Sequence, residues 1–284
     1  MSVSREVQIL DGRALARRLN GALKQEAARL SRPPGLAVVL VGSDPASQVY
    51  VRRKGIVADR LGFHHRQIDL PPETSQAELV RVLDALNTDA SIDGILLQLP
   101  LPAHLEASTL LDRIDPAKDV DGFTAINAGL LAQGRPNLVS CTPLGVLRLL
   151  KEADVWFRGM RACVIGRSNI VGRPMSHLLE QQDATVTLCH RFTGDLAPIV
   201  KESDIVVVAV GLPGLIKGEW IRPGAAVVDV GITRLEDGSL TGDVEFEAAK
   251  ERAGAITPVP GGVGPMTIAM LMRNTFEASR RLQG

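Results

Sequence analysis

A tyrosine and a lysine one helical turn apart are the first residues whose types and spacing suit chemistry. Tyr50 and Lys54 occupy positions i and i+4 of a segment expected to form a helix over residues 47–61, and Val57 and Leu61 continue the same stripe. Because arginines occupy the opposite side, Lys54 is expected to point along the buried face. A desolvated lysine has a lowered pKa and exchanges protons near neutral pH. The alternative is a lysine whose stem packs while its amine reaches water.

A glutamine and two aspartates supply further polar groups in the first half of the chain. Gln98 lies at the end of an apolar strand expected over residues 93–99, where an unpaired buried amide costs about 1–3 kcal/mol. It either orients Lys54 or satisfies backbone groups of the following loop, and the sequence favours neither role. Asp119 and Asp121 lie in a turn-rich segment. One of them can accept hydrogen bonds from a nitrogen-rich ring, or both can simply cap the turn.

A glycine-rich turn in the second half has the form of a phosphate-binding loop. A strand expected over residues 161–166 leads into the pattern G-x-S-x-x-x-G, from Gly166 to Gly172, and a helix containing Pro174 follows. In such a turn backbone N–H groups approach a pyrophosphate at the positive end of the helix. The pattern departs from the usual G-x-G-x-x-G, so by itself it also suits a tight turn that binds nothing.

A residue shortly after the next expected strand, residues 185–189, indicates which of the two nicotinamide dinucleotides is bound. NAD-binding folds usually carry an acid roughly 20 residues after the glycines, where it binds the ribose 2′-hydroxyl. This chain has Arg191 there. A guanidinium binds the 2′-phosphate of NADP bidentately, whereas a carboxylate would repel it. Arg167 and Ser168 can contact the same phosphate. Taken without the glycine turn, Arg191 is equally well an exposed surface arginine; together with it, NADP is favoured.

Other glycine-rich loops follow apolar runs. Residues 211–214 and 231–232 end two expected strands, and ligands of a doubly wound sheet sit at the carboxyl ends of its strands. Ile232 would then supply a backbone or apolar contact. Residues 257–266 are rich in glycine and proline, and glycine permits the backbone to approach a flat ligand closely.

Apolar runs that alternate with amphipathic helices indicate the scaffold for these residues. Continuous apolar strands separated by helices predict an α/β fold with parallel sheets covered on both faces. Since the rhythm restarts after a stretch rich in Gly, Pro and Asn, the 284 residues are expected to form two domains. Residues 1–140 carry Lys54, and residues 141–264 form a Rossmann-like doubly wound sheet. A C-terminal helix over 265–284 is expected to pack back on the first domain.

Composition excludes several classes of function. Thirty-two basic and 32 acidic residues give a formal net charge of zero, so nothing indicates nucleic acid or an anionic membrane as a partner. No run of about 18 apolar residues could span a bilayer, and no secretory signal is expected. Three scattered cysteines are too few for a disulfide framework, and no His/Cys/Glu cluster has metal-ligand spacing. A reduced, cytoplasmic protein without a metal is expected.

Five segments together resemble the bifunctional methylenetetrahydrofolate dehydrogenase/cyclohydrolase family. They are VGSDPASQVYVRRK at 41–54, GILLQLPLP at 94–102, DVDGF at 119–123, GRSNIVGRP at 166–174 and TPVPGGVGPMT at 257–267. They follow the family's order across nearly the whole chain, and five concurrent motifs are far more specific than any one of them. One departure is Ser140, which stands where the family commonly has a proline; it touches no proposed catalytic group.

The resemblance implies a two-step reaction in a cleft between the domains. A hydride passes from 5,10-methylenetetrahydrofolate to NADP, and water then opens the methenyl cation to 10-formyltetrahydrofolate, which feeds purine and formyl-methionine synthesis. By analogy Lys54 transfers the proton of the hydrolytic step and Gln98 holds it. Tyr50 would stack on the folate ring system, and Asp121 would bind the amino-pyrimidine edge of the pterin. The loop that lines the folate site is matched by Pro260, Gly261, Gly262 and Val263. The NADP-contacting positions are matched by Gly166, Arg167, Ser168, Arg191 and Ile232.

The resemblance also implies a homodimer, with the strands of the second domain as its contact surface. Two other functions compete with this interpretation. An NADP-linked dehydrogenase resembling shikimate dehydrogenases explains the second half of the chain but gives no reason for Tyr50, Lys54 and Gln98 together. A module that binds NADP and has lost catalysis is at odds with an intact Lys54. The residues do not address the loss of only one of the two activities.

Overall fold

The computed structural model describes residues 6–283, and the chain divides into two compact units. The first, here called the lysine unit, comprises Arg17–Cys141 and the residues from Ile268 onward. The second, here called the glycine-turn unit, comprises the residues up to Ala16 together with Thr142–Thr267. Each unit contains its own parallel sheet flanked by helices, so the predicted α/β class is confirmed.

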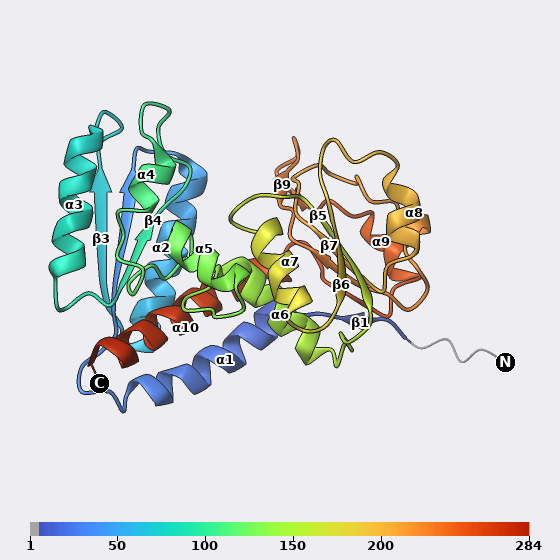
Figure 1. Cartoon of the computed structure of the whole chain (residues 1–284), viewed down its shortest axis with the longest axis horizontal. Coiled ribbons are helices and arrows are strands. Elements are labelled where there is room, and N and C mark those ends of the chain that lie inside the picture. The colour runs from blue at the N-terminus through green and yellow to red at the C-terminus, as the bar shows by residue number, and fades with distance from the viewer. Residues whose placement is uncertain (1–5, 284) are drawn as a thin grey trace. The chain divides into compact units, whose positions relative to one another are not determined.

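A three-stranded parallel sheet in the order β3-β2-β4 forms the centre of the lysine unit (Figure 1). The middle strand, β2 (Gly35–Val41), is buried along its whole length and lies between β3 (His64–Leu70) and β4 (Gly94–Leu97). Successive residues of a strand point to opposite faces, so Val38 enters one apolar core and Val39 enters another. Both faces of the sheet are therefore covered, as the continuous apolar sequence predicts.

The helix that carries Lys54 has well-defined ends. α2 (Pro45–Leu61) begins after Asp44, whose carboxylate accepts a hydrogen bond from the Ser47 amide at 2.8 Å. Proline suits the first turn because its missing N–H has no helical partner there. The helix ends at Gly62, which adopts a left-handed φ of 79° that glycine accepts without strain. The predicted helix and its glycine stop are confirmed.

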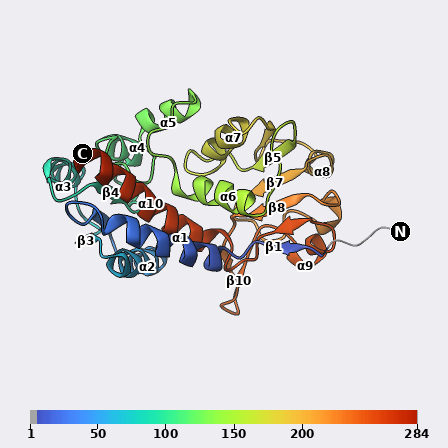
Figure 2. The same cartoon turned by 90° about the horizontal axis from the view of Figure 1, so that it is seen from below.

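Other helices cover the two faces of this sheet. α3 (Gln76–Thr88) and the short α4 (Ala107–Leu111) pack on one face. The other face packs against α2, the later residues of α1 (Gly12–Ala27) and α10 (Val263–Gln283). α1 and α10 lie side by side there, as Figures 1 and 2 both show. α5 (Ala125–Ala132) follows the turn with the two aspartates.

Six parallel strands in the order β1-β11-β8-β7-β5-β6 form the sheet of the glycine-turn unit. They are β1 (Gln8–Ile9), β5 (Arg161–Ile165), β6 (Thr185–Cys189), β7 (Ile205–Val208), β8 (Ala226–Asp229) and β11 (Ala255–Ile256). The helical elements are α6 (Cys141–Glu152), α7 (Gly172–Glu180), α8 (Leu196–Lys201), the 3-10 turn η1 (Gly218–Trp220) and α9 (Phe246–Lys250). From β5 the chain goes first to β6 on one side and then to β7, β8 and β11 on the other. This order confirms the predicted doubly wound sheet.

Two details concern the edges of the glycine-turn unit. β9 (Thr233–Arg234) and β10 (Leu240–Thr241) pair antiparallel, so the hairpin predicted around Gly238 is confirmed. The start of the chain differs from the expected domain of residues 1–140, because β1 pairs with β11 in the sheet of the other unit. A strand of two residues carries no pattern of its own and is recognised only from its tertiary partner.

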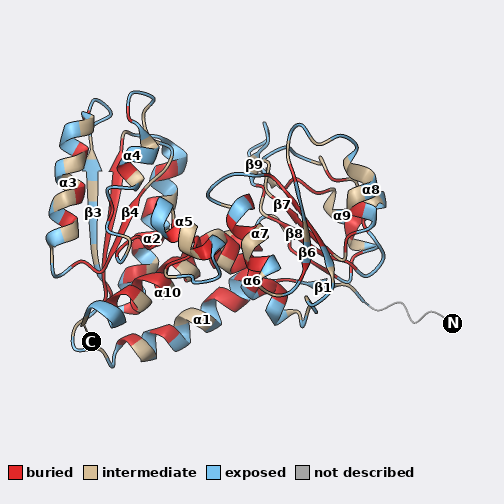
Figure 3. Cartoon of the chain, viewed as in Figure 1, coloured by how far each residue is buried: buried red, intermediate tan, exposed pale blue. Residues whose placement is uncertain are grey.

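Burial follows the strands of both sheets, as the red segments in Figure 3 show. The inner strands β2, β7 and β8 are buried at every residue, whereas β3 and β6, at the edges of their sheets, keep exposed residues. Within residues 6–283, no helix is long and apolar enough to cross a membrane.

Candidate functional site

Lys54 is buried in the lysine unit, and its amine has defined partners. The residue is 5% exposed, and its Nζ donates a hydrogen bond to Oε1 of Gln98 at 3.0 Å. The same amine lies 5.3 Å from the centre of the Tyr50 ring, within the range of a cation–π interaction. The alternative of a lysine whose amine reaches water is therefore wrong.

Gln98 fills both of the roles that the sequence left open. Its Oε1 accepts the hydrogen bond from Lys54, while its Nε2 donates to the carbonyl of Leu99 at 2.6 Å. Its backbone amide donates to the carbonyl of Val39 at 2.9 Å, which anchors the residue just past the end of β4. Because Nε2 is engaged by a carbonyl, the side chain presents its oxygen to the lysine. That oxygen accepts a hydrogen bond from the amine in either protonation state.

The two aspartates of the turn have different surroundings. Asp119 accepts hydrogen bonds from the backbone amides of Phe123 and Thr124 at 3.2 and 2.9 Å, which is turn capping. Asp121 instead lies within electrostatic reach of the Lys54 amine. The capping role therefore falls to Asp119, and ligand binding by Asp121 stays a prediction.

Burial and mutual charge shift the pKa values of the Lys54 amine and of two neighbouring groups, Asp121 and Cys141. Loss of water lowers the pKa of Lys54, and the negative charge of Asp121 raises it part of the way back. Loss of water raises the pKa of Asp121, and the positive charge of Lys54 opposes that change. Burial raises the pKa of the Cys141 thiol well above its ordinary value, so the thiol stays neutral. The lysine and the carboxyl group are both moved toward their neutral forms, which makes proton exchange easier than for exposed groups of the same types.

We call five residues the lysine cluster: Tyr50, Lys54, Gln98, Asp121 and Cys141. The first four were predicted from the sequence, and Cys141 was not. Its thiol donates a hydrogen bond to the carbonyl of Val120 at 3.2 Å and lies near the carboxyl group of Asp121. The available signal was its position beside Ser140, where the chain departs from the family pattern. A local pattern does not show, however, that the cysteine returns to a turn 21 residues earlier in the chain.

The glycine turn of the other unit is shaped by close backbone contacts. Gly166 has a φ of 114°, and a Cβ at this position would lie 2.3 Å from the carbonyl oxygen of Ala209, just past the end of β7. A Cβ on Gly172 would lie 1.8 Å from the carbonyl oxygen of Gly166. The turn thus lies beside the carboxyl ends of β5 and β7, where the strand order reverses. Doubly wound folds bind their ligands at this point.

Ser168 has a structural task within this turn. Its hydroxyl accepts hydrogen bonds from the amides of Val171 and Gly172 at 3.1 and 3.4 Å. Its carbonyl accepts one from the amide of Arg173 at 3.1 Å. These N–H groups at the start of α7 are therefore engaged within the protein. Some of the backbone N–H groups expected to bind a pyrophosphate therefore already donate to Ser168.

Arg167 and Arg191 converge on one exposed aromatic ring. Their guanidinium carbons lie 5.9 and 4.6 Å from the centre of the Phe192 ring, and Phe192 is 69% exposed. Guanidinium groups are the side chains that bind a phosphate group bidentately. The structure thus gives the two arginines a shared neighbour, and their contact with a phosphate stays a prediction. Phe192 was not predicted, because a single aromatic residue after a strand forms no motif.

Two buried aspartates hold the loops that follow β7 and β8. Asp243 accepts hydrogen bonds from the amides of residues 210–211 at 2.8 and 3.0 Å. Asp229 accepts the amide of Gly231 at 2.9 Å. Burial raises the pKa of Asp229 to about 6; backbone hydrogen bonds oppose the rise, and the nearby charge of Asp243 adds to it. Ile232 follows these anchors and is 49% exposed, so an apolar contact can form there.

The predicted folate-lining loop begins α10 and packs on the start of α1. A Cβ on Gly12 would lie 1.8 Å from the carbonyl oxygen of Gly262, and the carbonyl of Gly261 accepts the amide of Arg13 at 3.1 Å. The small residues of this loop therefore have a packing role of their own. Pro260 itself is exposed, and Val263 is buried.

The predicted site residues fall into two groups. The lysine unit holds Tyr50, Lys54, Gln98 and Asp121. The glycine-turn unit holds Gly166, Arg167, Ser168, Arg191, Ile232, Pro260, Gly261, Gly262 and Val263. Within residues 6–283, no three His, Cys, Asp or Glu side chains are grouped so that they could hold a metal ion.

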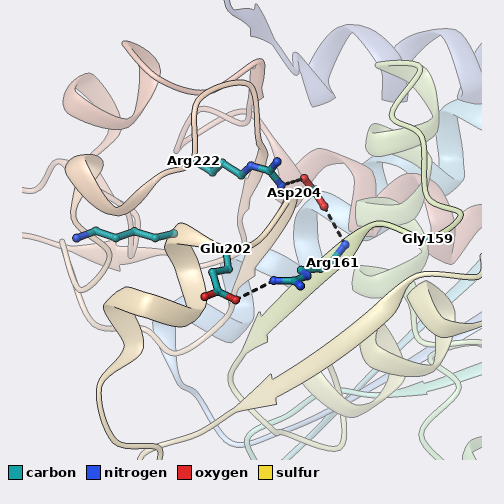
Figure 4. A pocket seen from close by; sticks show the side chains of 6 residues that line it. Gly159, Arg161, Glu202, Asp204 and Arg222 are labelled. Carbon is teal, nitrogen blue, oxygen red and sulfur yellow. Dashed lines mark hydrogen bonds and ion pairs between the residues drawn. The ribbon is translucent and has the colours of Figure 1, made fainter.

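A hollow at the amino ends of the strands in the glycine-turn unit has a different character (Figure 4). Arg161 donates to Glu202 at 2.8 Å, and Arg222 hydrogen bonds to Asp204, so the labelled charges neutralise one another. Arg161 begins β5, whereas the glycine turn follows the end of the same strand. The hollow is thus lined by a surface ion-pair network at the amino ends of the strands, whereas the glycine turn lies at their carboxyl ends.

Comparisons with known proteins match both halves of the chain. Residues 10–121 match the family described as tetrahydrofolate dehydrogenase/cyclohydrolase, catalytic domain, and residues 140–283 match its NAD(P)-binding domain. The bifunctional protein FolD 1 of Hydrogenovibrio crunogenus is 53% identical over 276 residues, covering 96% of this chain and 97% of that protein.

Two solved structures extend the likeness to the fold. The bifunctional FolD dehydrogenase/cyclohydrolase of Campylobacter jejuni has a TM-score of 0.96 at 43% identity, over 97% of this chain and 99% of that one. The Trypanosoma brucei enzyme, solved with NADP and an inhibitor, has a TM-score of 0.93 at 42% identity, over 97% and 98%. The likeness thus covers both units.

Proposed function

Because the chain belongs to the tetrahydrofolate dehydrogenase/cyclohydrolase family, we propose that it catalyses two successive reactions on tetrahydrofolate derivatives. The first oxidises 5,10-methylenetetrahydrofolate to the 5,10-methenyl cation with NADP. The second hydrolyses that cation to 10-formyltetrahydrofolate. The observation that carries the proposal is the buried amine of Lys54, held at 3.0 Å from Gln98. Such a desolvated amine suits the hydrolytic step, which needs a proton carrier.

Lys54 acts as the proton acceptor of the hydrolytic step. Water adds to the methenyl carbon and releases one proton. The bond from that carbon to N5 then breaks, the remaining hydroxyl becomes the formyl C=O as it loses its proton, and N5 takes up one proton. Because burial lowers the pKa of Lys54, its neutral amine is more accessible than that of an ordinary lysine and takes up the released proton. Gln98 orients the amine throughout, since its oxygen accepts a hydrogen bond from both forms. The Tyr50 ring, 5.3 Å away, stabilises the ammonium form.

Asp121 and Tyr50 bind the folate ring system. The carboxyl group of Asp121 pairs with the amino-pyrimidine edge of the pterin, since Asp119 is occupied by the backbone of its own turn. Tyr50 offers a flat ring on which the pterin stacks. The loop at Pro260–Val263 is assigned to the folate site on family grounds alone.

The glycine-turn unit binds NADP, which accepts the hydride of the first reaction when it is bound. Gly166 keeps the turn free of a side chain so that the backbone approaches the pyrophosphate, with Ser168 shaping the turn. Arg167 and Arg191 bind the 2′-phosphate, and Ile232 contributes an apolar contact. The oxidation needs no acid or base from the protein, only that the two reacting rings are held face to face.

Membership of the family decides against a dehydrogenase of the shikimate type, which would leave the lysine cluster without a purpose. A module that binds NADP without turnover is the remaining alternative. We also propose that the enzyme works as a homodimer in the cytoplasm. Free, buried thiols at all three cysteines are compatible with such a reducing compartment.

The test of this proposal follows absorbance when the purified protein meets methylenetetrahydrofolate with NADP and, separately, with NAD. Formation of NADPH, followed by decay of the methenyl absorbance, is the expected result. NADP binding without turnover of either folate would leave only the binding module. Reduction of NAD in preference to NADP would remove the role assigned to Arg191.

A further inference from the structure

Asn274 is a buried polar residue of α10 that the proposed reaction does not yet use. It is 5% exposed, and its side-chain Nδ2 donates hydrogen bonds to the carbonyls of Val120 and Val139, both at 2.8 Å. The same nitrogen lies 3.6 Å from the sulfur of Cys141. One amide group therefore joins two segments that are distant from it, by 154 and 135 residues, along the chain.

Both of these segments carry a member of the lysine cluster. Val120 directly precedes Asp121, and Val139 lies two residues before Cys141. The segments also touch at Gly122, where a Cβ would lie 2.6 Å from the backbone nitrogen of Ser140. Gly122 has a φ of 67°, so glycine suits both the turn and the close contact.

Asn274 and Cys141 donate hydrogen bonds to the same backbone carbonyl. The carbonyl of Val120 accepts both the Asn274 amide and the Cys141 thiol, which uses its two lone pairs. A buried carbonyl that loses its donor carries a desolvation cost, so these partners hold one another in place. Asp119 fixes the turn from its own side, whereas Asn274 ties it to the next segment.

The position of these segments sets the charges around Lys54. The carboxylate of Asp121 acts on the Lys54 amine and raises its pKa against the lowering effect of burial. A shift of the turn would move Asp121 relative to the amine and to the pterin edge that it binds. Geometry held by Asn274 thus reaches the reacting groups through other residues.

We propose that Asn274 is a positioning residue of the lysine cluster, which fixes Asp121 and Cys141 beside the Lys54 amine by tying together the two segments that carry them. This inference rests on the proposed function. It adds a residue of the C-terminal helix to the machinery of the hydrolytic step.

The test compares Asn274→Leu, which keeps a similar volume and removes the donor, with Thr275→Val. Thr275 is also buried on α10, but its hydroxyl donates to the carbonyl of Leu271 in the same helix, so it is a matched control. For Asn274→Leu we expect kcat/KM for methenyltetrahydrofolate hydrolysis to fall roughly ten- to hundredfold, a loss typical of misplaced catalytic groups. The KM for the folate should rise, and the Kd for NADP should stay unchanged. Thr275→Val should keep the wild-type KM.

Two further readouts separate positioning from folding. The Lys54-linked limb of the pH–rate profile should move to lower pH in Asn274→Leu, because the raising effect of Asp121 is weakened. A lower rate that follows the folded fraction, with KM and the pH limb unchanged, would overturn the proposal. If Asn274→Leu does not fold, Asn274→Ser, which retains one donor, should show the same changes at smaller size, and wild-type values for its KM and pH limb would also overturn it.

A measurement without turnover keeps this inference distinct from the proposed function. Wild-type protein that fails to hydrolyse methenyltetrahydrofolate would refute the proposed function before any variant is compared. NMR of protein labelled with ¹³C at the lysine Cε atoms reports the pKa of Lys54 directly. A lower value in the Asn274 variant than in the wild type supports the positioning role even then, and equal values contradict it.

Discussion

The lysine cluster and the proposed NADP site of the glycine-turn unit, which comprises the glycine turn, Arg167, Arg191 and Ile232, are built in opposite ways. The cluster consists of side chains that are mostly removed from water, with Lys54 only 5% exposed and its amine held by Gln98. The proposed NADP site consists of a glycine turn shaped by backbone contacts and of exposed residues such as Arg191 and Phe192. One region perturbs the pKa of a lysine, and the other leaves its cations in solvent.

This difference follows from the two tasks. Proton transfer by a lysine requires that its charged form is disfavoured, and burial disfavours that form. Binding of a phosphorylated cofactor instead requires permanent positive charge and a backbone that a ligand can approach. Substitutions in the first region should therefore change rates and pH profiles, and those in the second should change cofactor affinity.

The largest effect is expected from Lys54→Met. Removal of the proton carrier should lower the rate of methenyltetrahydrofolate hydrolysis by at least about a hundredfold, as general acid–base catalysis commonly contributes that much. The Kd for NADP, measured by fluorescence titration, should stay the same. Lys118→Met is the matched control, because Lys118 is also buried in the lysine unit and donates to the carbonyls of Leu86 and Asp89. Normal hydrolysis in Lys54→Met would contradict its role.

A smaller effect is expected from Arg191→Ala. Loss of a charge-assisted contact worth about 1.5–3 kcal/mol should weaken NADP binding roughly ten- to hundredfold. NAD lacks the 2′-phosphate, so its affinity should change little. Arg222→Ala removes the same charge at the amino ends of the strands and should leave both affinities unchanged. An equal loss of NADP and NAD binding in Arg191→Ala would show that this residue does not select the 2′-phosphate.

The smallest effect concerns Asp229, a buried carboxyl group within the region otherwise dominated by exposed charge. Burial raises its pKa to about 6 in the folded protein, above the value in the unfolded chain. The folded state therefore binds a proton more readily, and the stability from this group is present at low pH and lost as pH rises through about 6. Between pH 5 and pH 7 the free energy of unfolding should fall by roughly 1 kcal/mol from this group. Chemical denaturation of the wild type and Asp229→Asn at both pH values measures it, and parallel pH dependences would contradict it.

The sequence predicted most of what depends on local pattern. The continuous apolar run of β2 identified a strand buried on both faces, and Gly62 marked the end of α2 because glycine accepts a left-handed φ. The i, i+4 spacing of Tyr50 and Lys54 placed both on one helix face, and the structure places the lysine amine near the tyrosine ring. These features depend on neighbours within a few residues, so a sequence displays them.

The features that escaped prediction depend on contacts between distant segments. β1 exists only because two residues pair with β11 at the other end of the chain. Asn274 and Cys141 belong to no motif. Asn274 bonds to Val120, which lies 154 residues away in the sequence, and Cys141 bonds to the same residue from 21 residues away. Ser168 was expected to contact a phosphate, yet its hydroxyl also caps the start of α7. Such roles become visible only when the donors and acceptors are placed in three dimensions.

The central claim is that burial makes Lys54 a proton carrier, and the most direct test is the pKa of Lys54 itself. Protein labelled with ¹³C at the lysine Cε atoms would be titrated by NMR, and the Lys54 resonance identified by its absence from Lys54→Met. The chain has only seven lysines, so the spectrum is simple enough to assign. A pKa clearly below that of an ordinary lysine is the predicted result. A value at or above the ordinary one would contradict the account.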